Sequence, residues 1–236
     1  LVDGTGELRV LERGEEDFDA AIIGLGCFGI VVEMTLSVVP CFRLHTISET
    51  LPFDEVIHRF DELVDGHDHF KFWWLVPDDR VIVFRQRRTD EPANEHPLRR
   101  WLLDDLLSVQ VYRACLALER LNRQRIAPVV NRVIGRMVGR RYERISKSHR
   151  GFLTPVPPIH RESEWAFDYA HAKTLLRDYR TLMCSSPHQY SFIQEIRVTA
   201  ADEYWMSPAY QRDSLWLTQY NIDTPARWDD QLQRFE

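Results

Sequence analysis

The stretch that decides the fold is Gly24-Leu-Gly-Cys-Phe-Gly29, which runs directly into Ile30-Val-Val-Glu-Met-Thr-Leu-Ser-Val-Val-Pro40. Glycines at this spacing are typical of a dinucleotide-binding turn, but that fingerprint requires a helix after the glycines. The residues that follow alternate between apolar and polar and are rich in β-branched side chains, which favours a strand. We therefore predict a glycine turn that opens a strand over 30–39. Two interpretations of the turn stay open: a plain tight turn, or a close backbone approach to a cofactor.

The composition is ordinary for a globular protein, with 44% hydrophobic and 28% charged residues in 236. The uncharged run 20–32 is shorter than a membrane-spanning helix and contains glycines, so we expect no transmembrane helix. Cys27, Cys41, Cys115 and Cys184 are widely scattered, which favours reduced and mostly buried thiols over a disulfide framework. We predict no metal site, because the histidines around Asp68 lack a third ligand nearby in sequence.

Positive charge is concentrated in residues 97–150, which contain 13 Lys or Arg against 4 Asp or Glu in a chain of net charge −6. Arg125, Arg132, Arg136 and Arg140 recur at helical spacing. They form either a solvated face or a contact with an anionic membrane surface or an acidic partner. No aromatic ladder accompanies the charge, so we expect no nucleic-acid partner. With no targeting signal visible, we expect a cytoplasmic location, with a peripheral membrane contact as the alternative.

Periodicity predicts an α+β chain, because long antiparallel candidates alternate irregularly with helices. Predicted strands cover 7–11, 30–39, 42–49, 70–76, 80–87, 190–199 and 214–221, and the turn 77–79 makes a hairpin of two of them. Predicted helices cover 54–64, 98–141, 170–184 and 228–235, and a Pro-rich connector covers 151–158. Asp54 is expected to cap the first helix, and Pro128 to separate or kink two helices within 98–141.

One predicted strand carries a charged pair. Along 190–199, Ile196 lies on one face while Glu195 and Arg197 both lie on the other. A carboxylate beside a guanidinium can orient a hydroxyl and stabilise negative charge that develops nearby. The same spacing is also that of an ordinary same-face ion pair, which contributes little when exposed.

Several segments, in the same chain order, resemble one family of flavoproteins. Residues 24–40 resemble the end of the flavin domain in the vanillyl-alcohol-oxidase-type FAD fold. The segments that resemble the sugar-1,4-lactone oxidases (L-gulono-lactone, D-arabinono-lactone and alditol oxidases) are Phe70 to Thr89, Glu164-Trp165-Ala166, Glu195-Ile-Arg197-Val-Thr199, Asp202, Ser207-Pro208 and Arg212-Asp213-Ser214. Two departures concern the cap: Asp168 stands where the family usually has proline, and the hairpin turn has one extra residue at Leu75-Val76.

The resemblance implies FAD as the cofactor and a sugar lactone or polyol as the substrate. A hydride would pass from a hydroxyl-bearing carbon to the flavin, which O2, giving H2O2, or another electron acceptor would reoxidise. The resemblance assigns catalysis to Glu195, which would orient the hydroxyl, and to Arg197, which would stabilise negative charge. It assigns backbone contacts with the nucleotide half of FAD to Gly26, Gly29, Ile30 and Val31.

The resemblance also implies a division of the chain. Residues 1–41 would be the C-terminal part of an FAD-binding domain of the PCMH type. Residues 42–236 would be a C-terminally incomplete substrate-binding cap domain, with an antiparallel sheet, flanking helices and a basic helical insertion at about 98–141. The family's flavin-attachment loop and its His-Trp-Gly/Ala-Lys stretch are not in this sequence, so we expect a fragment that is inactive alone. A different class also stays open: a catalytically silent module that docks through its basic helices.

Overall fold

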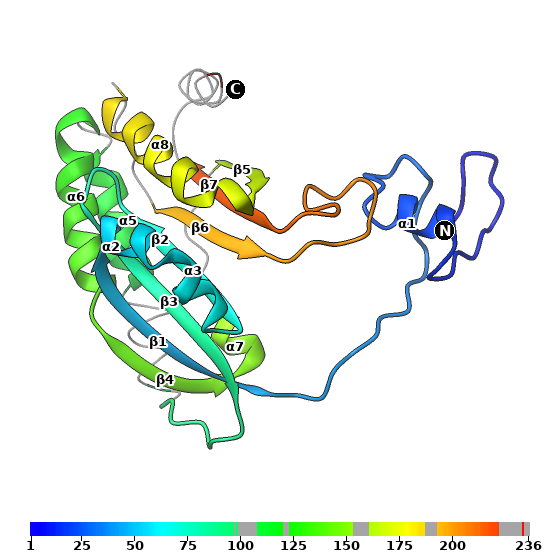
Figure 1. Cartoon of the computed structure of the whole chain (residues 1–236), viewed down its shortest axis with the longest axis horizontal. Coiled ribbons are helices and arrows are strands. Elements are labelled where there is room, and N and C mark those ends of the chain that lie inside the picture. Colours follow the sequence, from blue (N-terminus) through cyan, green and yellow to red (C-terminus); the bar gives the residue numbers. More distant parts are fainter. Residues whose placement is uncertain are drawn as a thin grey trace.

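The computed structural model describes residues 1–96, 98, 108–119, 123–152, 161–186, 193–221 and 233. Within these residues, seven strands form one sheet in the order β4-β1-β3-β2-β6-β7-β5, and every pairing is antiparallel (Figure 1). The strands are β1 (Arg43–Pro52), β2 (His69–Trp74), β3 (Arg80–Thr89), β4 (Tyr142–Lys147), β5 (Arg161–Asp168), β6 (Gln194–Thr199) and β7 (Ser214–Asn221). The predicted α+β class with a largely antiparallel sheet is confirmed.

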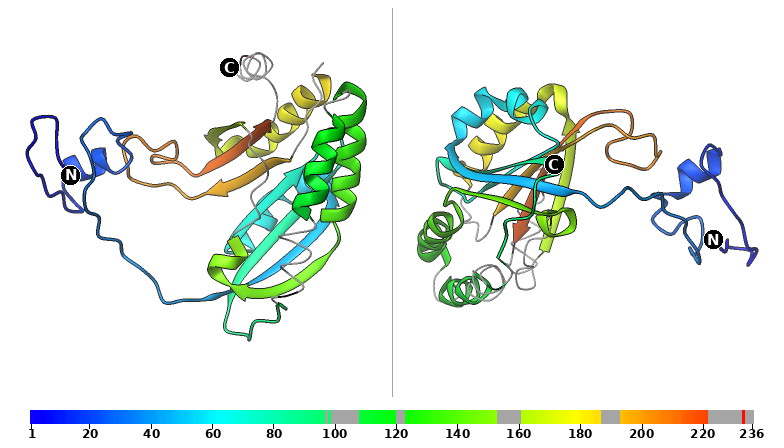
Figure 2. Two further views of the ribbon diagram at one scale, coloured as in Figure 1. Left: turned by 180° about the vertical axis from the view of Figure 1, so that it is seen from behind. Right: turned by 90° about the horizontal axis from the view of Figure 1, so that it is seen from below.

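Helices cover both faces of this sheet. One face carries α2 (Phe53–His58), α3 (Phe60–Asp65) and α8 (Ala172–Ser185). On the other face lie α5 (Ser108–Glu119) and α6 (Arg123–Val138), as the view from below shows (Figure 2). The short elements are α1 (Glu16–Ala21), α7 (Ser148–Phe152) and the 3₁₀ turn η2 (Tyr169–His171).

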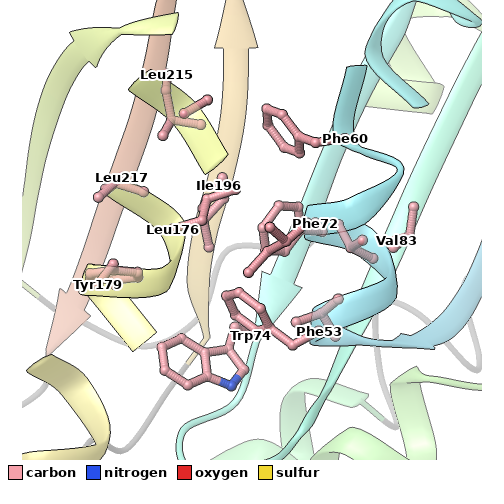
Figure 3. Close-up of a cluster of buried hydrophobic side chains, with 14 of the residues drawn as sticks. Phe53, Phe60, Phe72, Trp74, Val83, Leu176, Tyr179, Ile196, Leu215 and Leu217 are labelled. Carbon is pink, nitrogen blue, oxygen red and sulfur yellow. The ribbon is translucent and has the colours of Figure 1, made fainter. Parts of the chain in front are cut away.

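The larger core lies between the sheet and the first group of helices (Figure 3). Strand β2 supplies Phe72 and Trp74 to it, because alternate residues of a strand point to the same face. Phe53 of α2 packs edge-on against Trp74, with ring centroids 5.1 Å apart. Ile196 of β6 and Leu176 of α8 are buried in the same cluster. Full burial of each such side chain contributes about 1.5–3 kcal/mol, so this core fixes the face on which each strand's polar residues must lie.

The second core is smaller and covers only part of the opposite face. Val130 and Ile134 of α6 pack there against Trp73 of β2 and Phe84 of β3. Packing extends as far as Ile193, the residue just before β6. Beyond it, β6, β7 and β5 present polar side chains on this face, and the candidate site lies among them.

The strand predicted over 30–39 is wrong. Ile30 makes an isolated bridge with Val2, and residues 31–41 form an extended link from the N-terminal segment to β1 (Figure 1). Val38 is 87% exposed, and the apolar residues before it in this stretch are exposed as well. A strand requires a neighbour to accept its backbone hydrogen bonds, and none of the described residues lies beside this stretch. The strand predicted over 7–11 is likewise wrong, since it reduces to one bridge between Leu8 and Val2.

Helix boundaries also differ from those predicted. The helix expected over 54–64 is two short helices separated at Arg59, and Pro52 rather than Asp54 occupies the first cap position. Pro128 lies inside α6, so the two basic helices separate before it. The hairpin of β2 and β3, the helix over 170–184 and the strand over 214–221 are confirmed. The predictions for 99–107, 120–122, 153–158, 190–192 and 228–235 fall outside the described residues, apart from residue 233.

Burial of the cysteines was predicted wrongly. Cys27, Cys41 and Cys184 are free and exposed. The first two lie in the segment that precedes the sheet, and the third lies in the last turn of α8, so the cores do not reach them. The side chain of Cys115 lies outside the described residues.

Candidate functional site

The sheet register brings four polar side chains from four strands into one row. Trp73 of β2 pairs with Glu195 of β6, Glu195 pairs with Thr218 of β7, and Thr218 pairs with Glu164 of β5. Directly paired residues of neighbouring strands point to the same face, so all four side chains project from the face that α6 partly covers. The adjacent row contains Lys71, Arg197 and Trp216, by the same pairing. The sequence prediction that Glu195 and Arg197 share a face is confirmed.

Glu195 is the buried centre of this cluster, with a side chain only 8% exposed. Its Oε2 accepts hydrogen bonds from Trp73 Nε1 at 2.6 Å and from Lys71 Nζ at 2.9 Å. Its Oε1 lies 3.7 Å from Nη1 of Arg197. A buried carboxylate is costly unless it is paired and hydrogen-bonded, and here both needs are met by residues of β2 and β6.

Arg197 is the exposed member of the predicted pair, with a side chain 38% exposed. Its Nη2 donates to Glu164 Oε1 at 2.5 Å, and Thr218 Oγ1 donates to the same oxygen at 2.6 Å. The guanidinium also lies 5.6 Å from the ring centroid of Trp216. Arg197 therefore bridges two carboxylates across β5 and β6, and its planar group is held by charge and by an aromatic face.

Tyr220 of β7 belongs to the same face. Burial, followed by the negative charges of Glu195, Glu162 and Glu164, raises the pKa of its hydroxyl above the usual value. The phenol therefore stays protonated at neutral pH. As a protonated phenol it adds a hydroxyl beside the carboxylates.

The assembled face gathers the kinds of polar group that hydrogen-bond hydroxyls. It combines carboxylate acceptors, ammonium and guanidinium donors, and the hydroxyls of Thr218 and Tyr220. Sequence reasoning did not identify Lys71, Trp73 or Thr218 as site residues, and it used Glu164 only as part of a family motif. It also missed β4 and β5. The alternation of Glu162, Glu164 and Ala166 along 161–168 was the signal that could have revealed β5.

The glycine turn forms a separate hollow in the N-terminal segment. A pocket of about 290 Å³ is lined by residues that include Gly26, Gly29 and Val31. Gly26 has φ of +81°, and a Cβ added there would meet nothing within 4 Å. Gly29 has φ of +132°, and its added Cβ would lie 2.2 Å from the carbonyl oxygen of Val2. Gly29 is thus required by the local fold, whereas Gly26 leaves the backbone open to a ligand.

Ile30, the remaining residue predicted to contact a cofactor, does not line this pocket. Its N–H donates to Val2 O at 2.8 Å, and its carbonyl accepts from Val2 N at 2.8 Å. The remaining lining is apolar side chains and glycine backbone, and glycines allow a ligand to approach the backbone closely. The residues present therefore fit the nucleotide part of FAD, except that Ile30 is hydrogen-bonded to Val2 and does not line the pocket.

The structure does not bring the glycine turn onto the Glu195 face. The N-terminal segment lies to one side of the sheet, near the long loop between β6 and β7 (Figures 1 and 2). Arg13 Nη2 donates to the Tyr204 hydroxyl of that loop at 3.3 Å. Among the described residues, no group of three or more His, Cys, Asp or Glu side chains is arranged to hold a metal ion. In the same part of the chain, no helix has the length and apolar character needed to cross a bilayer.

This fold defines a class, an α+β unit with one antiparallel sheet whose polar face is left partly uncovered by its helices. The same fold occurs in cholesterol oxidase from B. sterolicum, with a TM-score of 0.62, 13% identity, and coverage of 81% of this chain and 44% of that one.

The chain belongs to the D-arabinono-1,4-lactone oxidase family, whose model matches residues 34–231. It is 27% identical over 218 residues to an L-gulono-1,4-lactone dehydrogenase of Mycobacterium tuberculosis, covering 92% of this chain and 50% of the relative. It is 25% identical over 211 residues to an L-gulonolactone oxidase of Scyliorhinus torazame, covering 86% and 46% respectively. The chain thus spans about half the length of these curated relatives.

Proposed function

We propose that the full-length protein is an FAD-dependent oxidoreductase that oxidises a hydroxyl of a sugar-1,4-lactone or polyol. Membership of the D-arabinono-1,4-lactone oxidase family and the names of the relatives support this substrate class. The observation that carries the proposal is the Glu195 and Arg197 pair, held on one face within a cluster of hydroxyl-binding groups. The acceptor that reoxidises the cofactor is O2 or another electron acceptor.

The roles follow from what each atom already contacts. Within the described residues, Oε1 of Glu195 accepts no hydrogen bond, so it can accept one from a substrate hydroxyl, while Lys71 and Trp73 hold Oε2. Arg197 would stabilise negative charge that develops on the substrate oxygen as the hydroxyl loses its proton. FAD, when bound, supplies the hydride acceptor. Gly26, Gly29 and Val31 would contribute to holding its nucleotide half, with Ile30 fixing the turn through Val2.

The test uses the full-length protein. We expect flavin absorbance in the purified protein and loss of that absorbance when an aldonolactone or alditol is added without oxygen. Readmission of O2, compared with an artificial acceptor, then distinguishes an oxidase from a dehydrogenase. A protein that binds FAD but is bleached by no aldonolactone or alditol would instead be the catalytically silent module.

For the division of the chain, we propose that residues 1–41 belong with an FAD-binding domain and residues 42–236 with a substrate-binding cap. The exposed link 31–41 between the N-terminal segment and β1 supports this boundary. Limited proteolysis of the full-length protein should cut first in this link when FAD is removed, because cofactor loss loosens the segment before it. Initial cleavage within the sheet would contradict the boundary.

We infer a second function, docking to an anionic membrane surface, from α6. Arg125, Arg132 and Arg136 of α6, and Arg140 two residues after its end, are all exposed. Their neighbours on the exposed side include apolar residues at helical spacing, Val129, Val133 and Met137. Arginines beside exposed apolar side chains suit an interface that combines lipid phosphates with acyl chains. The protein would then be cytoplasmic and peripheral to a membrane.

Sedimentation with vesicles tests the docking proposal. The full-length protein should sediment with vesicles that contain anionic phospholipid, and less so at high salt, because salt screens the charges. The double variant R132Q/R136Q should lose most of this binding, whereas a control variant R177Q, on α8 across the sheet, should retain it. Equal recovery with neutral and anionic vesicles would refute the proposal, and fractionation of cells would test the location directly.

A further inference from the structure

Among the residues that the structure describes, Lys71 is the cation that contacts Glu195 at hydrogen-bond distance. Its Nζ lies 2.9 Å from Oε2, and Trp73 Nε1 donates to the same oxygen at 2.6 Å. Both donors come from β2, the strand beside Glu195. They turn one edge of the carboxylate toward β2 and leave Oε1 on the side of Arg197, at 3.7 Å.

Aromatic rings restrict the position of the Lys71 ammonium. Nζ lies 5.1 Å from the ring centroid of Trp73 and 5.8 Å from that of Phe84. These rings belong to the core that α6 covers, and the Lys71 side chain is only 32% exposed. In surroundings of low polarity, the attraction between Lys71 and Glu195 is stronger than that of an exposed pair. Lys71 is therefore fixed by packing as well as by charge.

The contacts of Arg197 show what Lys71 changes. Arg197 donates to Glu164 at 2.5 Å but stays 3.7 Å from Glu195. A buried carboxylate without a close cation would draw the guanidinium inward, because an unpaired buried charge is costly. With Lys71 on its other oxygen, Glu195 is already neutralised. The guanidinium can then remain with Glu164 and face outward.

We propose that Lys71 is a positioning residue for the proposed reaction, acting through Glu195 to keep Oε1 turned toward the substrate and Arg197 directed outward. This proposal rests on the function proposed above. It assigns Lys71 no direct contact with substrate. Its effect on the reaction should therefore depend on the carboxylate of Glu195.

A double-mutant cycle in the full-length FAD-containing enzyme tests this dependence. K71M should slow flavin reduction by a lactone about tenfold in the wild-type background, from loss of a charge-assisted hydrogen bond. In the E195Q background the same change should cost less than about twofold, because the charge that Lys71 neutralises is gone. K71R should restore most of the rate. The matched control is K173M. It removes an ammonium of α8 that is paired with Asp61 of α3 at 2.5 Å, and it should leave the rate unchanged.

Equal slowing by K71M in both backgrounds would overturn the proposal, since Lys71 would then act without Glu195. Urea unfolding supplies a readout that does not depend on turnover. K71M should lower the urea midpoint more in the wild-type background than in E195Q, and equal shifts would overturn the coupling. If the wild-type flavin is reduced by no lactone or polyol, the proposed function fails, and the unfolding cycle still decides whether Lys71 and Glu195 are coupled.

Discussion

Replacement of Arg197 by alanine is the perturbation that most directly tests the proposed chemistry. Arg197 holds Glu164 at 2.5 Å, lies 3.7 Å from Glu195 and contacts the face of Trp216. Alanine would remove the exposed cation while leaving the sheet intact, because the side chain takes no part in either hydrophobic core. The loss measured should therefore be one of function, with little loss of stability.

The expected loss of rate depends on the two carboxylates beside Arg197, Glu164 and Glu195, because they offset part of its positive charge. Its guanidinium must retain enough positive charge to stabilise a developing substrate anion, and removal of one such stabilising donor costs about 10²–10³ in rate. Arg197 is more than one-third exposed, so water weakens its effect, and we expect the lower end of this range. Flavin reduction in R197A should fall about a hundredfold, equivalent to about 2.7 kcal/mol. The rate of R197K should lie between those of R197A and the wild type, since an ammonium keeps the positive charge but not the planar guanidinium that reaches Glu164 and Glu195 together.

Stopped-flow absorbance under anaerobic conditions, at saturating lactone, measures the reduction step directly. The FAD content and the thermal midpoint of each variant must match those of the wild type. R177A is the matched control, because Arg177 lies on α8 at the opposite face of the sheet and, within the described part of the chain, donates only to the backbone carbonyl of Lys173. A rate for R197A within threefold of wild type, with cofactor and fold intact, would refute the assignment.

Three further predictions concern the fold. Phe72→Ala should lower the free energy of unfolding by about 3–5 kcal/mol in urea titrations, because it empties a fully buried site in the main core; a loss under about 1 kcal/mol would contradict this packing. Gly29→Ala should speed amide exchange at Val2 and Ile30, since its Cβ would meet the Val2 carbonyl at 2.2 Å; unchanged exchange would contradict that contact. Burial lowers the pKa of His69 below 6.5, so the unfolded state takes up its proton first and stability falls as pH drops below 6.5. H69F should lose less stability than wild type between about pH 7 and 5 in denaturation curves, and identical pH dependence would refute this.

Periodicity predicted correctly the elements whose two faces differ in environment. The hairpin of β2 and β3 was predicted because two aromatic and β-branched runs are joined by a Pro-Asp-Asp turn. Helix α8 was found because its apolar residues follow a helical period. The same reasoning failed over 30–39, where the alternation is strong but no neighbouring strand is present among the described residues. Local pattern specifies which face can be buried, whereas pairing requires a partner from elsewhere.

The sequence by itself determined the α+β class, the shared face of Glu195 and Arg197, and the likeness to sugar-lactone oxidases, because strand alternation and motif order are local properties of the chain. Only the tertiary structure decided that Lys71, Trp73, Thr218 and Glu164 surround that pair. They come from β2, β7 and β5, and the register that places them side by side depends on which strands pair and on which face the cores bury. Lys71 and Glu195, which are 124 positions apart, are thereby hydrogen-bonded to each other, and no spacing along the chain encodes such a contact.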